Sequence, residues 1–170
     1  PDAAKKDAGN LFLSHANLRR MEAEPLRDSI LQTTGKLDRR VGGPGYQLFT
    51  YRVVNVAIYG NLENFGPETW RRSIYQQAAR SIHDEILSAF DCPESSQRAP
   101  RRDSTTTALQ ALNLLNGPFM LQQAEFMAQR VVRTAGSSTD RQITAAMQWA
   151  CLRSPSTAEM GKFRTFVKAQ

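Results

Sequence analysis

Residues 101–118 read RRDSTTTALQALNLLNGP and combine a capping segment, an apolar helix and a helix stop. Leucines recur every three residues over 109–115, which places them on one face of a helix. Glycine and proline then end the helix, and Pro118 is suited to the first position of the next one. Side-chain oxygens that can cap the first turn belong to Asp103, Ser104 and Thr105. The stretch therefore predicts a helical hairpin with a very short corner.

Further helices are predicted after this corner. Apolar residues at helical spacing predict helices over 118–134, from about 139 and from about 156, where Glu159 can complete a capping box. Consecutive helices with short corners pack as bundles. We therefore expect a helical bundle over 104–170 that forms the stable centre of the fold, with the Phe and Met side chains of the last three helices in its core.

The N-terminal third predicts a linker and one long helix. Residues 1–10 are small and polar, so we expect a linker or a disordered segment over 1–13. Residues 14–35 carry an apolar stripe that predicts a long helix, and Gly35 is a natural stop. Pro25 lies within that helix and either kinks it or marks the start of a new one.

Residues 46–80 are the only region with strand character. Aromatic and β-branched residues over 46–59 predict a strand. Residues 71–83 fit a helix by the recurrence of apolar side chains every four positions, and strand against helix stays open there. A short helix is expected over Asp84–Phe90. The expected class is thus mainly α (α+β): an N-terminal helix, a small antiparallel ribbon and a C-terminal bundle, forming a single domain over 14–170.

The composition is that of an ordinary globular domain with excess positive charge. Lys and Arg number 22 against 16 Asp and Glu, giving a formal charge of +6. The basic residues come as scattered pairs, not as the dense block typical of a nucleic-acid arm. No apolar run is long enough to span a bilayer, so we expect no membrane span. A chain that opens at Pro1 without a signal peptide is expected to be part of a longer protein.

The cysteines and histidines form no recognisable metal motif. Cys92 and Cys151 lie outside any Cys-x-x-Cys pattern, so no metal or haem attachment site is expected in this chain. They either pair, if the parent protein is exported, or stay two separate buried thiols, which we favour. His83, followed by two acidic residues, suggests an acid–base cluster; acids at a helix start are the interpretation we favour.

The strongest ligand hypothesis concerns the start of the helix in 101–118. Arginines and hydroxyl side chains beside free helix amides suit a sulfate, phosphate or carboxylate. The candidate ligand-binding residues are Arg101, Arg102, Ser104, Thr105 and Thr106. Capping by the hydroxyls, with the arginines paired to acids elsewhere in the domain, explains the same residue types and is favoured.

A second ligand hypothesis concerns the aromatic residues of the ribbon region. They could form a stacking face for a sugar or a base. Packing of the ribbon on the helices is the favoured alternative. The residues concerned are Tyr46, Tyr51, Tyr59, Trp70 and Tyr75.

The chain resembles a known family in several segments that keep their order. The basic pair, the Ser/Thr run, the Leu-Gln-Ala-Leu core and Leu-Asn-Gly-Pro of residues 101–118 resemble the C-terminal part of a domain of unknown function, number 1553, from large proteins of planctomycetes and related bacteria. Gly117 stands where that family usually has Asp, and Pro25 also departs from its pattern. The other matching segments are 19–24, 26–31, 71–75, 90–94 and 152–159.

The resemblance implies a setting rather than an activity. It implies a strand from Arg71 to about Ala79, paired with the earlier strand, which we therefore favour for that segment. It also implies an exported protein of the periplasm or cell surface, with another uncharacterised domain upstream and in many cases a cytochrome c-like domain. Any haem would thus belong to the upstream part, and no cofactor is expected in this chain.

Three functions remain open from the sequence. The first is a structural or docking module that packs on the upstream domains of the same protein, which predicts an exposed apolar patch. The second is binding of an anionic ligand, such as an acidic glycan, sulfate or phosphate. The third is nucleic-acid binding through the basic surface. A free-standing enzyme ranks last, although a site shared with the upstream part stays open.

Overall fold

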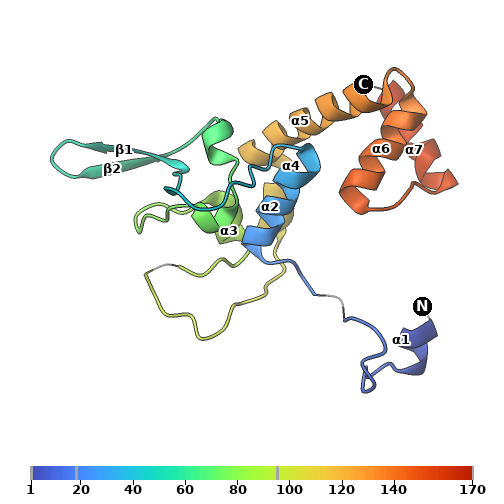
Figure 1. Cartoon of the computed structure of the whole chain (residues 1–170), viewed down its shortest axis with the longest axis horizontal. Helices are drawn as coiled ribbons and strands as arrows, with labels where there is room; N and C mark the ends of the chain where they lie inside the picture. Colours follow the sequence, from blue (N-terminus) through green and yellow to red (C-terminus); the bar gives the residue numbers. More distant parts are fainter. Residues whose placement is uncertain (1, 18, 95, 170) are drawn as a thin grey trace.

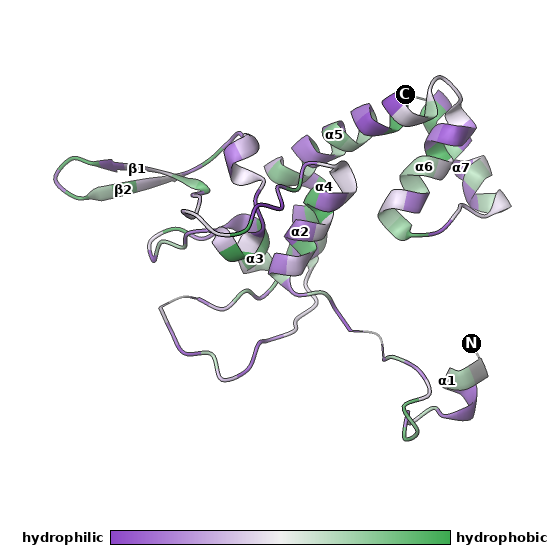
Figure 2. Ribbon diagram, in the orientation of Figure 1, coloured by the Kyte–Doolittle hydropathy of each residue, from purple (hydrophilic) through white to green (hydrophobic). Residues whose placement is uncertain are grey.

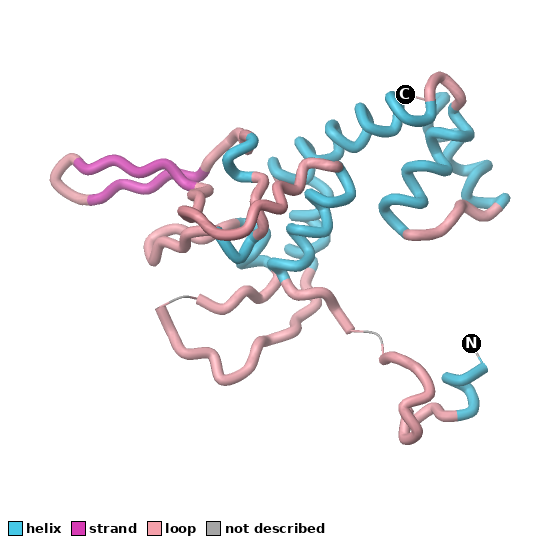
Figure 3. Tube along the Cα trace, viewed as in Figure 1, coloured by secondary structure: helices cyan, strands magenta, loops and turns pink. Residues whose placement is uncertain are grey.

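The computed structural model describes residues 2–17, 19–94 and 96–169, and most of the regular structure in them is helical (Figures 1 and 3). The helices are α1 Asp2–Lys6, α2 Ala23–Thr34, α3 Glu85–Ala89, α4 Ala108–Asn116, α5 Pro118–Ala135, α6 Thr139–Cys151 and α7 Thr157–Lys168. Strands β1 Phe49–Val53 and β2 Ala57–Asn61 form an antiparallel ribbon, and 3-10 turns lie at Pro67–Thr69 and Ser73–Tyr75. The expected mainly α class with a small ribbon is confirmed.

The hydrophobic core lies between α2, α3 and α5. Its buried residues are Ala23, Leu31, Ile86, Phe90 and Phe119. Thr34 Oγ1 donates a buried hydrogen bond of 2.7 Å to Gln123 Oε1, which joins α2 to α5 by a polar contact as well. α4 packs against α3 and α5 at the side of this core.

The expectation that the C-terminal helices form the stable centre is wrong. Figure 1 shows α6 and α7 as a hairpin at the far end of α5, away from α2 and α3. α6 packs on α5, and α7 packs on α6. No residue of α7 is buried, and Phe166 is 62% exposed, so the Phe positions of α7 that were predicted as core are open, whereas Phe119 of α5 is buried as predicted. Helical spacing identified the apolar face correctly but could not say what covers it.

The predicted long helix begins later than expected. α2 starts at Ala23, so Pro25 occupies its first turn, where a missing N–H costs no hydrogen bond. Pro25 therefore marks a helix start and not a kink. Gly35 ends α2 with a left-handed φ of 76°. Leu18, which was placed in the predicted helix, lies outside the described residues. The expected N-terminal linker also contains the short α1.

The predicted single strand over 46–59 is a hairpin. β1 and β2 pair in register from Phe49↔Asn61 to Val53↔Ala57, with a turn around Asn55 between them. The strand favoured over 71–79 is wrong. That segment forms the 3-10 turn Ser73–Tyr75 and only isolated bridges, such as Tyr46↔Gln76. Its Gln and Ala residues are poor strand formers, so no ladder extends there. The short helix predicted near Asp84 is confirmed as α3, with the Asp84 carboxylate accepting from Leu87 N at 2.7 Å.

One buried cation joins α2 to the loops beneath the ribbon. Arg27 is 1% exposed, and its guanidinium donates to Thr69 O at 2.7 Å and to Arg71 O at 3.2 Å. The guanidinium also lies 5.4 Å from the centre of the Tyr46 ring and 5.2 Å from that of Phe119. Backbone carbonyls and aromatic faces thus replace water around the buried guanidinium charge.

We expect Arg27→Ala to lower the free energy of unfolding by roughly 3 kcal/mol, because the carbonyls lose their donors and a cavity opens. Arg98→Ala, which removes the same charge from an exposed loop, should change it by less than about 0.5 kcal/mol. Urea unfolding followed by circular dichroism measures both. Equal effects in the two variants would show that Arg27 does not hold these elements together.

Candidate functional site

The hydroxyl segment before α4 is arranged differently from the prediction. Thr107, and none of the residues Asp103, Ser104 or Thr105, caps α4. Thr107 Oγ1 accepts from Gln110 N at 3.3 Å, and Gln110 Oε1 accepts from Thr107 N at 3.2 Å, which completes a capping box. A Thr directly before the leucine-rich stretch, with a Gln three residues later, is the sequence pattern of a capping box. This pattern was visible in the sequence.

Asp91 holds the predicted site residue Thr105. Its carboxylate accepts from Thr105 N at 2.9 Å and from Thr105 Oγ1 at 2.8 Å. Arg20 bridges the same two residues, pairing with the Asp91 carboxylate and donating to Thr105 O. These hydrogen bonds keep the pKa of Asp91 below its ordinary value of 3.8. An internal carboxylate thus occupies donors that were candidates for an external anion.

The two predicted arginines have different environments. Arg102 makes a bidentate contact with Glu24, with both N···O distances at 2.7 Å, and lies 3.5 Å from Glu22. The hydrogen bonds from Arg102 keep the pKa of Glu24 below its ordinary value of 4.5. Arg101 is exposed and donates to no acceptor within the described residues.

These residues surround an open cleft of about 700 Å³ between the start of α2 and the segment before α4. Of the candidates, Arg101, Arg102 and Ser104 line it, whereas Thr105 faces Asp91 and Thr106 is exposed outside the lining. The structure therefore brings three candidates together. The lining residues are Arg19, Arg20, Met21, Glu22, Phe90, Asp91, Arg101, Arg102, Asp103 and Ser104.

The cysteines remain apart. Cys92 is half-buried with Sγ 3.6 Å from Glu24 Oε1, and burial, aided by that carboxylate, raises the pKa of its thiol to about 11. Cys151 is exposed at the end of α6, so the expectation of two buried thiols is wrong for this residue. Helical spacing placed Cys151 beside an apolar stripe, but only the partner helix decides whether it is covered.

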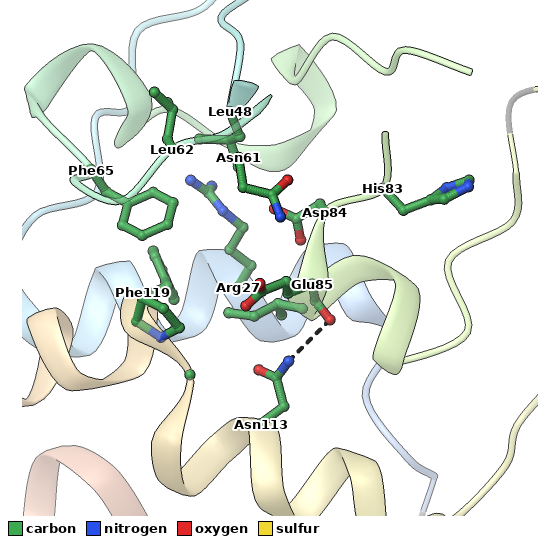
Figure 4. Close-up of a pocket in the computed structure, with 13 residues that line it drawn as sticks. Arg27, Leu48, Asn61, Leu62, Phe65, His83, Asp84, Glu85, Asn113 and Phe119 are labelled. Carbon is green, nitrogen blue, oxygen red and sulfur yellow. Dashed lines mark hydrogen bonds between the residues drawn. The ribbon is translucent and has the colours of Figure 1, made fainter. Parts of the chain in front are cut away.

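A small pocket of about 40 Å³ lies over Arg27, between α2, α3 and the base of the ribbon (Figure 4). Asn113 Nδ2 donates to Glu85 O at 3.2 Å there, while Asn113 Oδ1 has no partner within the described residues. The volume suits ordered water beside these polar groups. Both Arg27 and Asn113 lie in segments that resemble the family, but sequence reasoning gave neither a role because neither matches a catalytic or ligand-binding motif.

The suggested acid–base cluster does not form. Figure 4 shows the His83 side chain pointing away from the pocket, and its Nε2 lies 4.0 Å from Glu94 Oε1. Asp84 caps α3 and Glu85 occupies its first turn, as favoured from the sequence. In the part of the chain that the structure describes, no group of three or more His, Cys, Asp or Glu side chains could hold a metal ion.

The aromatic residues of the ribbon region divide into two sets. Tyr46 is buried against Arg27, and the Trp70 ring packs edge-on against Phe126 at 5.4 Å. The Tyr51 ring lies 5.3 Å from that of its cross-strand partner Tyr59, and Tyr51 is mostly exposed. The ribbon projects from the body in Figure 1, so the favoured packing on the helices holds for the first set alone.

An open apolar surface lies on α4. Leu109, Leu112 and Leu115 are 62%, 55% and 70% exposed, although their spacing puts them on one face. Figure 2 shows α4 as largely hydrophobic. Beside it, a groove of about 520 Å³ separates α4 from α3. The groove is lined by His83, Asp84, Glu85, Ser88, Ala89, Leu109, Leu112, Asn113, Asn116, Gly117 and Pro118.

The fold and its open apolar faces define a mainly helical module. The family model for PSD1, a protein of unknown function (DUF1553), matches residues 1–167, and the chain belongs to this family. The resemblance seen in the sequence is thereby confirmed. No curated protein and no solved structure gives a significant match. Within the described ranges, every helix is too short or too polar to cross a membrane.

The carboxylates around the segment before α4 should make stability depend on pH. Folding lowers the pKa values of Asp91 and Glu24, so the unfolded chain binds more protons near pH 4. We expect their contribution to be complete above about pH 6 and to be lost as the pH falls below their ordinary values of 3.8 and 4.5. Urea unfolding between pH 3 and pH 7 measures this slope.

The matched variant for this measurement is Asp91→Asn combined with Glu24→Gln. It should be less stable at pH 7 and show a flatter pH dependence than the unchanged chain. Arg153→Gln, which opens an exposed pair with Glu159 on α7, controls for the general loss of an ion pair. A slope unchanged in the double variant would contradict a stabilising role for the two carboxylates.

Proposed function

We propose that the chain is a structural and docking module of an exported multidomain protein and packs on the domain that precedes it. The observation that carries this proposal is the leucine face of α4, which is more than half exposed at all three positions. An amphipathic helix places its apolar face against a partner. α3 and α5 both pack on α4 but leave these leucines more than half exposed, so the leucine face is available to another domain.

Other open surfaces support the same function. The tip of the ribbon exposes Val53, Val54 and Val56, and α7 exposes Phe166. Scattered apolar residues are normal on a surface, whereas the leucines of α4 and the valines of the ribbon tip are grouped. In this proposal the site of action is the periplasm or cell surface, and any haem is carried by the upstream part.

The test is hydroxyl-radical footprinting of Leu115 in the isolated chain and in the intact gene product. We expect at least fivefold slower oxidation of Leu115 in the intact product, because the preceding domain covers it. Equal oxidation of Leu115 in both proteins would contradict docking through α4.

The intact mass and visible absorption of the same gene product test its composition. A mass well above that of this chain supports the multidomain part of the proposal, and a haem absorption band supports a redox partner in the same polypeptide. A mass equal to that of this chain would overturn the multidomain part.

A second candidate function is binding of an acidic glycan or another anion at the 700 Å³ cleft. The observation in its favour is Arg101, an exposed guanidinium without a protein acceptor among the described residues, which lines the cleft beside Arg19. Arg102 and Arg20 are engaged by carboxylates, so any anion would rely mainly on Arg101 and Arg19.

Heparin chromatography separates a defined site from general basic charge. Arg101→Gln should elute at a clearly lower salt concentration than Arg141→Gln, which removes an equal charge from exposed α6. Equal elution of the two variants would remove the cleft as an anion site. Retention on a DNA column that falls equally in both variants would instead support nucleic-acid binding through the overall charge.

A further inference from the structure

The N-terminal segment displays a cluster of three large apolar side chains. Leu11, Phe12 and Leu13 are 84%, 85% and 84% exposed. A carboxylate holds their turn, since Asp7 accepts from Leu11 N at 2.8 Å and from Phe12 N at 3.0 Å. Ser14 Oγ donates to the same carboxylate at 3.0 Å. The turn is therefore built by local hydrogen bonds, and its apolar side chains are free to contact another surface.

The groove between α3 and α4 matches this turn in chemistry. Ala89, Leu109 and Leu112 supply an apolar lining, and Asp84 and Glu85 add acidic groups at its α3 side. Directly before the turn, α1 ends with a pair of basic residues, Lys5 and Lys6. An apolar turn with a basic helix thus corresponds to an apolar groove with an acidic rim.

The length of the chain allows the two to meet. Arg20 is fixed beside α4, because it pairs with Asp91 and donates to Thr105 O, two residues before the α4 cap. Leu13 lies seven residues before Arg20 and can reach roughly 23–25 Å from it. The part of α4 from its cap to Leu115 spans roughly 12 Å. The attached turn also has a high effective concentration at the groove.

We propose that residues 2–13 dock in the groove between α3 and α4 of their own chain. Leu11, Phe12 and Leu13 then cover Leu109 and Leu112, and the two lysines approach Asp84 and Glu85. The proposal rests on the proposed docking function, since it names the first segment to cover the leucine face. A docked N-terminal segment would also direct a preceding domain towards the remaining part of that face, at Leu115.

Disulfide equilibrium in the full 170-residue chain tests this contact. Cys92→Ala and Cys151→Ser remove the native thiols, and Ala8→Cys with Asn116→Cys places one thiol on the segment and one at the groove. The matched control pairs Ala8→Cys with Thr134→Cys, an exposed position at the far end of α5. Equilibration with oxidised and reduced glutathione gives the effective concentration of one thiol at the other in each pair. We expect this value to be at least tenfold higher for the groove pair than for the control pair.

Two changes separate the forces involved. Phe12→Ser should reduce the effective concentration of the groove pair to that of the control pair, because the apolar contact is lost. Lys5→Glu together with Lys6→Glu should lower it severalfold at low salt and less at high salt. Equal effective concentrations for groove and control pairs would overturn the proposal. Disulfides found only in dimers would overturn it in favour of docking between two copies.

The outcome is independent of the footprinting experiment. Leu115 lies outside the groove lining, so its protection in the intact gene product reports on a preceding domain alone. A failed disulfide test with a protected Leu115 would leave the docking function standing and remove the N-terminal segment as the occupant of the groove.

Discussion

The buried guanidinium of Arg27 is the contact on which the body of this protein depends. It comes from the middle of α2, yet its acceptors lie more than forty residues further along the chain, at Thr69 and Arg71. A desolvated charge tolerates few alternative arrangements, because each lost acceptor leaves a donor unpaired at high cost. Arg27 therefore fixes loops that contain little regular structure. Tyr46 and Phe119, from the ribbon base and α5, complete its surroundings.

A second group of charged contacts positions the long segment between α3 and α4. Asp91 and Glu24 bind Thr105 and Arg102, so carboxylates from the body hold the segment that leads into α4. Polar contacts therefore specify where α4 starts, and its leucine face is not needed to position the helix. That face is thus available for other contacts, as the proposed docking function requires.

Local signals in the sequence predicted local structure well. The capping box at Ser156, the Gly35 stop, the α3 start at Asp84 and the corner at Pro118 are set by neighbours within a few residues. Burial was harder to predict, since a helical stripe shows which side is apolar but not which element covers it, as Phe166 shows. The candidate site was predicted in part. Arg101 and Arg102 do line a cleft, but the acids that engage Arg102 lie almost eighty residues away in sequence.

The ribbon has a consequence for handling the isolated chain. In a sheet of two strands, both strands are edges, so β1 and β2 each keep a row of unpaired backbone groups. Their sequence is rich in valine and tyrosine, and Arg52 is the only charge between Phe49 and Asn61. Such edges template further strand pairing, and a single basic side chain is a weak barrier to it. At high concentration the chain should therefore grow into ordered aggregates through this ribbon, starting from the hairpin tip.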